Sequence, residues 1–393
     1  MRLALREIRR SKVRFSLLTV AIGLLVFLAF FMQTLLVNLL GFFTGALEHQ
    51  SATVLVYGED ARRSLEGSSV TPAQIAAVGA VPGVGSSGPL GERSFTVTAN
   101  GKEVDAILFG YDLAEPGAPT KLATGRLPQR EGEGVGSAID AEQGFGVGDT
   151  VRVVPGGEAD APPLPIRIVG TADESRFSVL PTVFVPWDTY VAAVRRANPA
   201  APEVRPSAVA VIPERGVSPA DLAARINRTV PGVDALTRDE AVADAPGVAS
   251  VSQSFNLIIG LTYIVITIVI GFFFVILTVQ KAASLTLLRA IGADTRTLVG
   301  ALFVQVLIVV AVAMAIGAGI LSLAALASSP VFPISADPTL ILQVGATILV
   351  LALVAALAAA RRIARIDPID AVTRPSLGDR KSTRLNSSHI PLS

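Results

Sequence analysis

The sequence contains no cysteine, a single tryptophan and two histidines. Without thiols, the chain can form no disulfide, no cysteine-ligated metal centre and no thiol nucleophile. It also lacks the Gly-x-x-x-x-Gly-Lys-(Ser/Thr) motif that cradles nucleotide phosphates and the His-Glu-x-x-His signature of zinc hydrolases. We therefore expect no catalytic residues, no metal and no cofactor on this chain, and no ATP hydrolysis by a P-loop of its own.

Charge is missing from four long apolar runs, at residues 15–40, 253–280, 297–327 and 340–360. Each run is long enough for a helix to cross the ~30 Å hydrocarbon core of a membrane. Hydrophobic residues make up 51% of the chain, which is high for a soluble protein. Ion-driven transporters place ionisable groups inside their spans, so the uncharged runs argue against a secondary transporter.

Basic residues mark the ends of these runs. Residues 1–14 carry six Lys or Arg side chains against one acid, and Arg361, Arg362 and Arg365 follow the last run. The positive-inside rule therefore predicts a multi-pass protein of the cell membrane, with residues 1–14 and 361–378 in the cytosol. The first run is too long for a signal peptide, so we predict an uncleaved span. The formal net charge of +1 gives no field that would attract nucleic acid.

Residues 41–252 differ from the rest because proline, glycine and charge return and no segment is apolar enough to cross a membrane. Short alternating runs predict strands, among them a hairpin whose two-residue turn is Asn100-Gly101. Two helices are predicted after Thr71 and Ser218, because each hydroxyl residue suits an N-cap and precedes a proline. The likeness of the two segments indicates either an internal repeat of helix and strand or two independent solutions to one capping problem.

The predicted fold is a membrane protein with four transmembrane α-helices and a large α+β extracytoplasmic domain, residues 41–252, inserted between helices 1 and 2. Residues 328–339, which hold three prolines, form the predicted outer turn between the third and fourth spans. Small residues spaced four apart in the third span would let a neighbouring helix approach. They form two sets, Ala311, Ala315 and Gly319, and separately Ala313 and Gly317.

A short segment at residues 281–296 connects the second and third spans and is predicted to be helical. Leu285, Leu288 and Ile291 recur three apart and would share one face, while Gly292 suits the left-handed residue at a helix C-terminus. Because two spans flank the segment, it must lie at one face of the membrane. It is either an amphipathic helix that offers an apolar patch to a partner or an interfacial helix held by lipid headgroups.

Lys281, followed by Leu-Leu-Arg-Ala-Ile-Gly-Ala at residues 287–293, resembles the cytoplasmic loop of FtsX/MacB-type ABC transporter permeases. The sequence departs from the family pattern at residues 283–285, where Ala-Ser-Leu replaces an acidic residue and isoleucine. The segments 4–10 and 361–372 also resemble the sequence motifs at the two ends of this family, so the resemblance covers about residues 1–375. The residues that it assigns to ATPase coupling are Lys281, Leu285, Leu288, Arg289, Ile291 and Gly292.

The resemblance implies a non-catalytic permease subunit whose coupling helix docks onto a separate cytosolic ATPase, which carries the ATP and magnesium. It implies a permease homodimer in membrane lipid, in which ATP hydrolysis moves the extracytoplasmic domain by mechanotransmission. The expected activity is export or extraction of a hydrophobic or amphipathic substrate, such as a drug, peptide, haem-like molecule or lipoprotein. The alternative is an FtsX-like regulator that activates an extracellular cell-wall hydrolase without transport. A membrane-anchored enzyme is a third alternative, which no catalytic motif supports.

Two features of the sequence are set aside. His49, next to Glu48 at the outer end of the first span, could bind a metal or haem, but such sites need several ligands. We therefore interpret it as a solvated interfacial residue. Residues 379–393 are polar and aperiodic and look like translated sequencing-adapter read-through, so we treat them as a non-native tail and leave them out of the fold.

Overall fold

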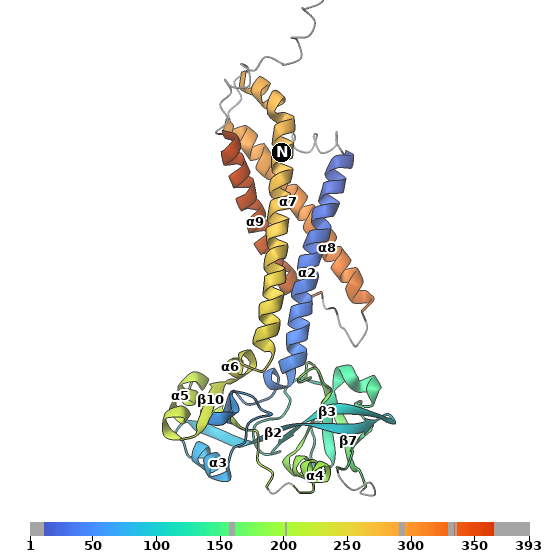
Figure 1. The fold of residues 1–393 in the computed structure, drawn as a ribbon, viewed down its shortest axis with the longest axis vertical. Coiled ribbons are helices and arrows are strands. Elements are labelled where there is room, and N and C mark those ends of the chain that lie inside the picture. The colour runs from blue at the N-terminus through green and yellow to red at the C-terminus, as the bar shows by residue number, and fades with distance from the viewer. Residues whose placement is uncertain are drawn as a thin grey trace, which may run out of the picture. The chain divides into compact units, whose positions relative to one another are not determined.

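The computed structural model describes residues 12–156, 162–200, 203–290, 295–328, 334 and 336–364 (Figure 1). Its four long helices are α2 (Lys12–Glu48), α7 (Val248–Ala290), α8 (Thr295–Leu326) and α9 (Pro338–Ala364). Each contains a segment long and apolar enough to cross a membrane: Phe15–Glu48, Val248–Phe273, Val304–Leu326 and Pro338–Ala358. The four predicted spans are therefore helices. Most of the predicted N-terminal segment 1–14, nearly all of the C-terminal segment 361–378, and the tail 379–393 lie outside the described residues.

Two helices run beyond their predicted ends. The predicted first span stops at residue 40, but α2 continues to Glu48, and α7 begins at Val248 instead of residue 253. The predicted coupling segment is helical as far as Ala290, and this helical part is the unbroken C-terminal end of α7. No proline or glycine lies between residues 272 and 290 to interrupt the helix. Residues 291–294, which include Ile291 and Gly292, lie outside the described residues.

The chain divides into two compact units, each described by itself, and the first holds the helical segments within residues 12–30, 260–321 and 337–364. In this unit, α2 and α8 approach closely at small residues. A Cβ atom added to Gly23 would lie 2.9 Å from Ile316 Cγ2, and one added to Gly317 would lie 2.9 Å from the Phe27 backbone nitrogen. Ala313 and Gly317 are thus buried in a helix contact, as their spacing predicts. The other small residues, Ala311, Ala315 and Gly319, are exposed.

The second unit holds the C-terminal part of α2, the start of α7 and the inserted domain between them, residues 49–247. The strands of this domain are β1 (Val54–Gly58), β2 (Val84–Ala99), β3 (Lys102–Tyr111), β4 (Leu122–Gly125), β5 (Glu133–Ser137), β6 (Thr150–Val153), β7 (Leu164–Ala172), β8 (Thr182–Pro186), β9 (Ala208–Pro213) and β10 (Val233–Thr237). The helices are η1 (Glu59–Ala61), α3 (Pro72–Gly79), η2 (Ala138–Gln143), α4 (Trp187–Ala197), α5 (Pro219–Thr229) and α6 (Arg238–Ala243). In Figure 1 these elements form the part of the fold that contains both strands and short helices.

Two strand–helix–strand units form one half of the domain. β1, α3 and β2 make the first and β9, α5 and β10 make the second, and the four strands pair antiparallel in the order β10-β1-β9-β2. This is the β-α-β-β-α-β arrangement of ferredoxin-like folds. The two similar segments thus each supply the helix of a strand–helix–strand unit, which favours the first of the two alternatives, an internal repeat of helix and strand. Both predicted N-caps form, since Gln74 N–H donates to Thr71 Oγ1 over 3.3 Å and Asp221 N–H donates to Ser218 Oγ over 3.2 Å.

A β-rich insertion between β2 and β9 forms the other half. The predicted hairpin is present, with Ala99 paired to Lys102 and positive φ angles at Asn100 (49°) and Gly101 (75°). β3 then pairs with β8 in parallel, and β8 leads into α4. The 16-residue strand β2 joins the two halves, because it pairs with β9 in the first half and with β3 and β6 in the second.

Side chains along each strand alternate between the two faces of the sheet, so the ferredoxin-like half has two separate cores. Val54 and Val56 of β1 face one core with α3 and α5, whereas Leu55 and Tyr57 face a second core on the opposite side of the sheet. The second core also holds side chains of α2, and this contact decides how a span is attached to the domain. A third core, around Phe95 and α4, lies in the insertion.

Candidate functional site

The end of α2 is built into the core of the inserted domain. Ala46 and Leu47, in the last turn of the helix, are 0% and 1% exposed. They share the second core with Leu55 and Tyr57 of β1 and with Phe109 of β3. Only a few residues separate Glu48 from β1, so no flexible linker stands between the helix and the sheet. Because a packed core does not deform continuously, a displacement of this helix end must move the sheet with it.

The segment between β7 and β8, residues 173–181, holds the last turns of α2 through its backbone, and we call it the clamp. Val179 N–H donates to Phe42 O (2.8 Å), Ser178 N–H donates to Phe43 O (3.1 Å), and Ala46 N–H donates to Arg176 O (3.0 Å). In an uninterrupted α-helix, Phe42 O would accept from Ala46 N–H. The clamp therefore takes over helix hydrogen bonds at the point where α2 meets the domain.

The clamp fits because α2 carries a glycine where the two backbones meet. A Cβ atom on Gly45 would lie only 2.3 Å from Glu174 O. The clamp itself is strained, since Glu174, Ser178 and Val179 have φ angles of 47°, 49° and 66°. Positive φ is costly for a β-branched residue such as Val179, and surrounding contacts must hold it in place. The geometry thus identifies the clamp as a fixed, over-determined joint.

A buried ion pair fastens the clamp to the rest of the domain. Arg176 Nε donates to Asp140 Oδ2 over 2.9 Å, and a second guanidinium nitrogen pairs with Asp140 Oδ1. Ser137 Oγ donates to the same carboxylate. The Arg176 guanidinium also lies 5.0 Å from the centroid of the Phe42 ring, a cation–π contact with α2. Since Arg176 is 8% exposed and Asp140 0%, loss of either partner would leave an uncompensated buried charge.

The edge of this joint carries a more exposed ionic cluster. His49 Nε2 lies 2.7 Å from Glu174 Oε2, and Lys121 Nζ pairs with the same carboxylate oxygen. The hydrogen bond from Lys121 and the charges of Lys121 and His49 lower the pKa of Glu174 against the opposing effect of burial. His49 is therefore placed as a partner of Glu174 beside the clamp, more buried than the solvated position that we expected.

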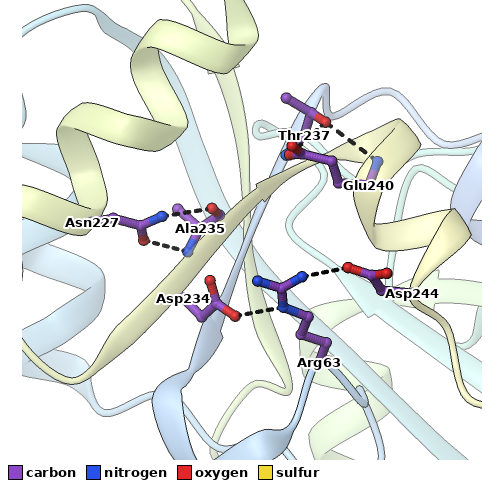
Figure 2. A network of polar contacts seen from close by, with 7 residues as sticks. All are labelled: Arg63, Asn227, Asp234, Ala235, Thr237, Glu240 and Asp244. Carbon is purple, nitrogen blue, oxygen red and sulfur yellow. Dashed lines mark hydrogen bonds and ion pairs between the residues drawn. The ribbon is translucent and has the colours of Figure 1, made fainter.

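Just before α7, the chain is fastened to the domain by a different, exposed joint (Figure 2). The Arg63 guanidinium lies between Asp234 and Asp244, with Nε donating to Asp234 Oδ2 over 3.0 Å and a terminal nitrogen paired with Asp244. The hydrogen bonds that Arg63 donates to Asp244 and Asp234 raise the pKa of Arg63 above its ordinary value. Asp234 belongs to β10, and Asp244 is the C-cap of α6, just before α7. We call this pair of contacts the Arg63 latch.

The elements around the Arg63 latch are each well anchored. Asn227 of α5 bonds both backbone groups of Ala235, with its amide donating to the carbonyl over 2.9 Å and accepting from the N–H over 2.6 Å. Thr237 and Glu240 form a reciprocal capping box at the start of α6. Figure 2 shows the Asn227–Ala235 contact to the left of Arg63 and the Thr237–Glu240 contact above it. α5, β10 and α6 thus form one unit, and the turn at residues 245–247 leads from it into α7.

An apolar pocket of about 180 Å³ lies along α2 in this second unit. It is lined by Phe31, Thr34, Leu35, Asn38, Leu39, Phe42 and Ile334. The Thr34 hydroxyl is buried and has no hydrogen-bond partner among the described atoms. The pocket is therefore suited to an apolar group that carries a hydrogen-bonding atom.

Residues 15–229 match the family described as the MacB-like periplasmic core domain, and residues 256–368 match the FtsX-like permease C-terminal family. The first match alone covers more than half of the chain. The chain belongs to the MacB/FtsX family of ABC transporter permeases. The resemblance seen in the sequence is confirmed, and so is the fold class, with four candidate transmembrane helices and a MacB-like extracytoplasmic domain between the first helix and the others. Membership of this family of ABC transporter permeases implies a partner ATPase component.

Two relatives of this permease match most of its length. The uncharacterized ABC transporter permeases Rv2563 and Rv0072 of Mycobacterium tuberculosis are each 26% identical to it, over 378 and 384 residues. These matches cover 93% and 95% of this chain and 97% and 99% of the relatives.

Two solved structures are similar to the inserted domain. The periplasmic region of MacB from Actinobacillus actinomycetemcomitans is 14% identical, with a TM-score of 0.35, and the match covers 49% of this chain and 92% of that one. The extracellular domain of the ABC-type transporter YknZ from Gram-positive bacteria is 17% identical, with a TM-score of 0.33, covering 48% and 100%.

The ATPase-coupling residues expected from the sequence do not belong to either joint. Lys281, Leu285, Leu288 and Arg289 lie on the C-terminal part of α7, and the structure describes their backbone only. Ile291 and Gly292 lie outside the described residues. Sequence reasoning missed Arg176, Asp140 and Arg63, whose partners are distant along the chain. The sequence offers one signal near this joint, the glycine at position 45, which meets the Glu174 backbone; nothing lies within 4 Å of a Cβ atom added to the neighbouring Gly41.

Proposed function

We propose that this permease couples ATP hydrolysis by a separate cytosolic ATPase to movement of its extracytoplasmic domain. Movement of the domain would drive export or extraction of a hydrophobic or amphipathic substrate, such as a drug, a peptide, a haem-like molecule or a lipoprotein. The observation that carries the proposal is the attachment of α2, whose last turn is packed in the domain core and clamped through its backbone. A helix held in this way can pass a displacement from the membrane to the domain.

The cytosolic end of this transmission is assigned to residues 281–296. Under the proposal, the N-terminus and C-terminus are cytosolic, and Leu285, Leu288 and Ile291 present an apolar patch to the ATPase. Lys281, Arg289 and Gly292 complete the coupling set. The continuous helix α7 supports the proposal, because it runs from Val248, directly after the inserted domain, into this segment as far as Ala290. A continuous helix transmits movement along its own length.

The substrate class is supported by the apolar pocket along α2. Its lining of Phe and Leu side chains, with the unpartnered Thr34 hydroxyl, suits an apolar group better than a charged one. A permease homodimer in membrane lipid would place two such pockets in one assembly. The match to a MacB-like core domain does not favour the alternative of an FtsX-like regulator of a cell-wall hydrolase.

The coupling assignment is tested with Leu288→Asp, which places a charge on the predicted docking face. We expect the ATPase to be lost from the permease during purification in mild detergent, with the permease itself still inserted in the membrane. Thr286→Asp is the matched control, because helical periodicity places residue 286 on the opposite face from residue 288. If Leu288→Asp keeps full ATPase binding, the docking assignment is wrong.

The proposed orientation is tested with single cysteines in the naturally cysteine-free chain. Val147 is 53% exposed at the surface of the inserted domain, so a cysteine there should react with an impermeant maleimide added to intact cells. A cysteine at Ser284 should react only after the membrane is opened. The reverse pattern would overturn the proposed topology.

A further inference from the structure

The structure assigns Arg63 the role of a positioning residue: we propose that it holds the end of α6, from which α7 starts, against β10 of the extracytoplasmic domain, and that α7 turns about residues 245–247 while α2 moves rigidly with the domain. This inference rests on the proposed function, since it names the moving joint of that transmission. It differs from the general proposal because the two helices are given unequal roles.

The α2 joint leaves no room for independent movement. Three backbone hydrogen bonds connect the clamp to Phe42, Phe43 and Ala46, and the buried Arg176–Asp140 pair fixes the clamp to the domain. To turn α2 relative to the sheet, all of these contacts and the packing of Leu47 would have to break together. The helix and the domain therefore behave as one body.

The α7 joint lacks such contacts. Among residues 248–259, only Val248 and Ile259 are buried, and Ala249, Ser250 and Gln253 are exposed. The connection to α6 is short and ends at Gly247, whose φ of +86° is a conformation that glycine adopts without strain. A Cβ atom on this glycine would lie 3.4 Å from the Phe43 ring, so the turn also passes close to α2. This turn is suited to act as a hinge.

The Arg63 latch lies on the domain side of this hinge and fixes the chain just before it. One carboxylate, Asp234, is fixed in the sheet, and the other, Asp244, lies three residues before Gly247. Arg62 and Arg63 both have positive φ angles, of 48° and 62°, so the backbone is held in an unusual conformation where it presents the guanidinium. Because the three side chains are 46%, 28% and 42% exposed, water and salt can replace their contacts. The latch can therefore open and close at little cost.

The experiment measures two distances by spin labelling in the assembled transporter. One variant carries cysteines at Val147 and Ser250, which report domain to α7, and the other carries them at Val147 and Val37, which report domain to α2. All of these side chains are exposed in the structure. Labelled permease is diluted with unlabelled cysteine-free permease, so that each signal comes from one chain. Each pair is measured without nucleotide and with a non-hydrolysable ATP analogue.

We expect Arg63→Ala, without nucleotide, to broaden or shift the Val147–Ser250 distribution and to leave the Val147–Val37 distribution unchanged. The change in population should be about fivefold at most, the range that an exposed ion pair produces. Arg63→Lys, which keeps one charge, should show an intermediate effect. Arg205→Ala is the matched control, because Arg205 is equally exposed and forms a surface pair with Glu203 at 3.0 Å that includes no residue of α6 or α7.

The outcomes separate this inference from the proposed function. If Arg63→Ala leaves the Val147–Ser250 distribution unchanged, or if the Val147–Val37 distance changes with nucleotide, the latch and hinge are wrong. If the ATPase is bound but neither distance responds to nucleotide in any variant, the proposed transmission itself fails. A response of the α7 pair alone, altered by Arg63→Ala and not by Arg205→Ala, supports both.

Discussion

The two helices that enter the extracytoplasmic domain are attached by contacts of opposite character. α2 ends inside the domain core, with a buried ion pair and a backbone clamp, whereas α7 begins at the surface, next to an exposed ion pair and a glycine. Both joints use an arginine held by aspartate, so the difference lies in burial and not in residue type. Buried pairs are costly to break and surface pairs are not.

The contrast shows how one chain can provide both a rigid and a mobile connection. The cost of breaking a pair is set by how much charge is left without water, so burial at Arg176 makes a joint permanent. At Arg63, water is available to both partners when they separate. Substitutions at the two joints should therefore differ in the size and in the salt dependence of their effects on stability.

The largest effect is expected at Arg176. Arg176→Ala leaves Asp140 buried without its partner and should lower the free energy of unfolding of the domain by about 3–5 kcal/mol. The measurement is urea unfolding of the full permease in detergent, followed by the fluorescence of Trp187. This residue is the single tryptophan of the chain and stacks on Tyr190 inside the domain.

The double variant Arg176→Met, Asp140→Leu is the control for this prediction. It removes both charges and retains apolar volume, so it should recover most of the lost stability. If the double variant is as unstable as Arg176→Ala, the shape of the clamp matters more than its charge. A loss below about 1 kcal/mol in Arg176→Ala would place this pair in the same class as the surface latch and remove the contrast.

Local patterns predicted the spans, the Asn100-Gly101 hairpin and the two capped helices, because each depends on neighbouring residues only. The joints could not be predicted in this way. Arg176 and Asp140 are 36 residues apart, and Arg63 and Asp234 are 171 apart, so their pairing exists only in the folded sheet. Surface and core arginines look the same in a sequence without a tertiary context.

Some strands were also missed for a physical reason. β5 (Glu133–Ser137) contains two glycines, which weaken a strand in isolation, and it did not appear as a strand in the sequence. In the fold, a Cβ atom on Gly136 would lie 2.4 Å from Phe145 O, so the site requires glycine for close packing. Tertiary contact therefore overrides local propensity here, as it does at Gly45.

The next largest effect concerns pH and a carboxylate on the face of the sheet that receives α2. Glu92 is 5% exposed, and one of its oxygens has no partner among the described atoms. Burial, together with the charge of Glu66, raises the pKa of Glu92 to about 7, against the opposing effect of Arg93. A raised pKa means that the protonated form stabilises the fold, so this contribution is lost as pH rises through about 7.

In the native chain, the free energy of unfolding of the domain should therefore decline between about pH 5 and pH 8, and Glu92→Gln should remove this decline. At pH 8.5 the free energy of unfolding of the variant should be higher than that of the native chain by on the order of 2–3 kcal/mol. Unfolding is followed by Trp187 fluorescence at each pH. Glu133, whose pKa Arg126 lowers to about 2, stays ionised across this range and does not interfere. Parallel pH profiles for the variant and the native chain would show that Glu92 is hydrated and not buried in solution.

A smaller effect distinguishes the two glycines near the end of α2. Gly45→Ala places a Cβ atom against Glu174 O and should cost about 1–3 kcal/mol of domain stability, because the backbone cannot move aside. Gly41→Ala is the matched control, since nothing lies within 4 Å of its added Cβ. The control should be neutral or should stabilise the helix by up to about 1 kcal/mol. Equal effects at both positions would mean that the clamp does not contact α2 as described.

The smallest effect is expected at Arg63, and its small size is what distinguishes the exposed Arg63 latch from the buried Arg176–Asp140 pair. Arg63→Ala should lower domain stability by less than about 1 kcal/mol, because the side chain and both carboxylates are exposed to water. The difference from the native chain should shrink further in ~1 M salt, where the screening length is about 3 Å. Arg176→Ala should keep most of its effect in the same salt. A salt-independent loss of several kcal/mol at Arg63 would mean that the latch is buried in the assembled permease, and α7 would then be as firmly attached as α2.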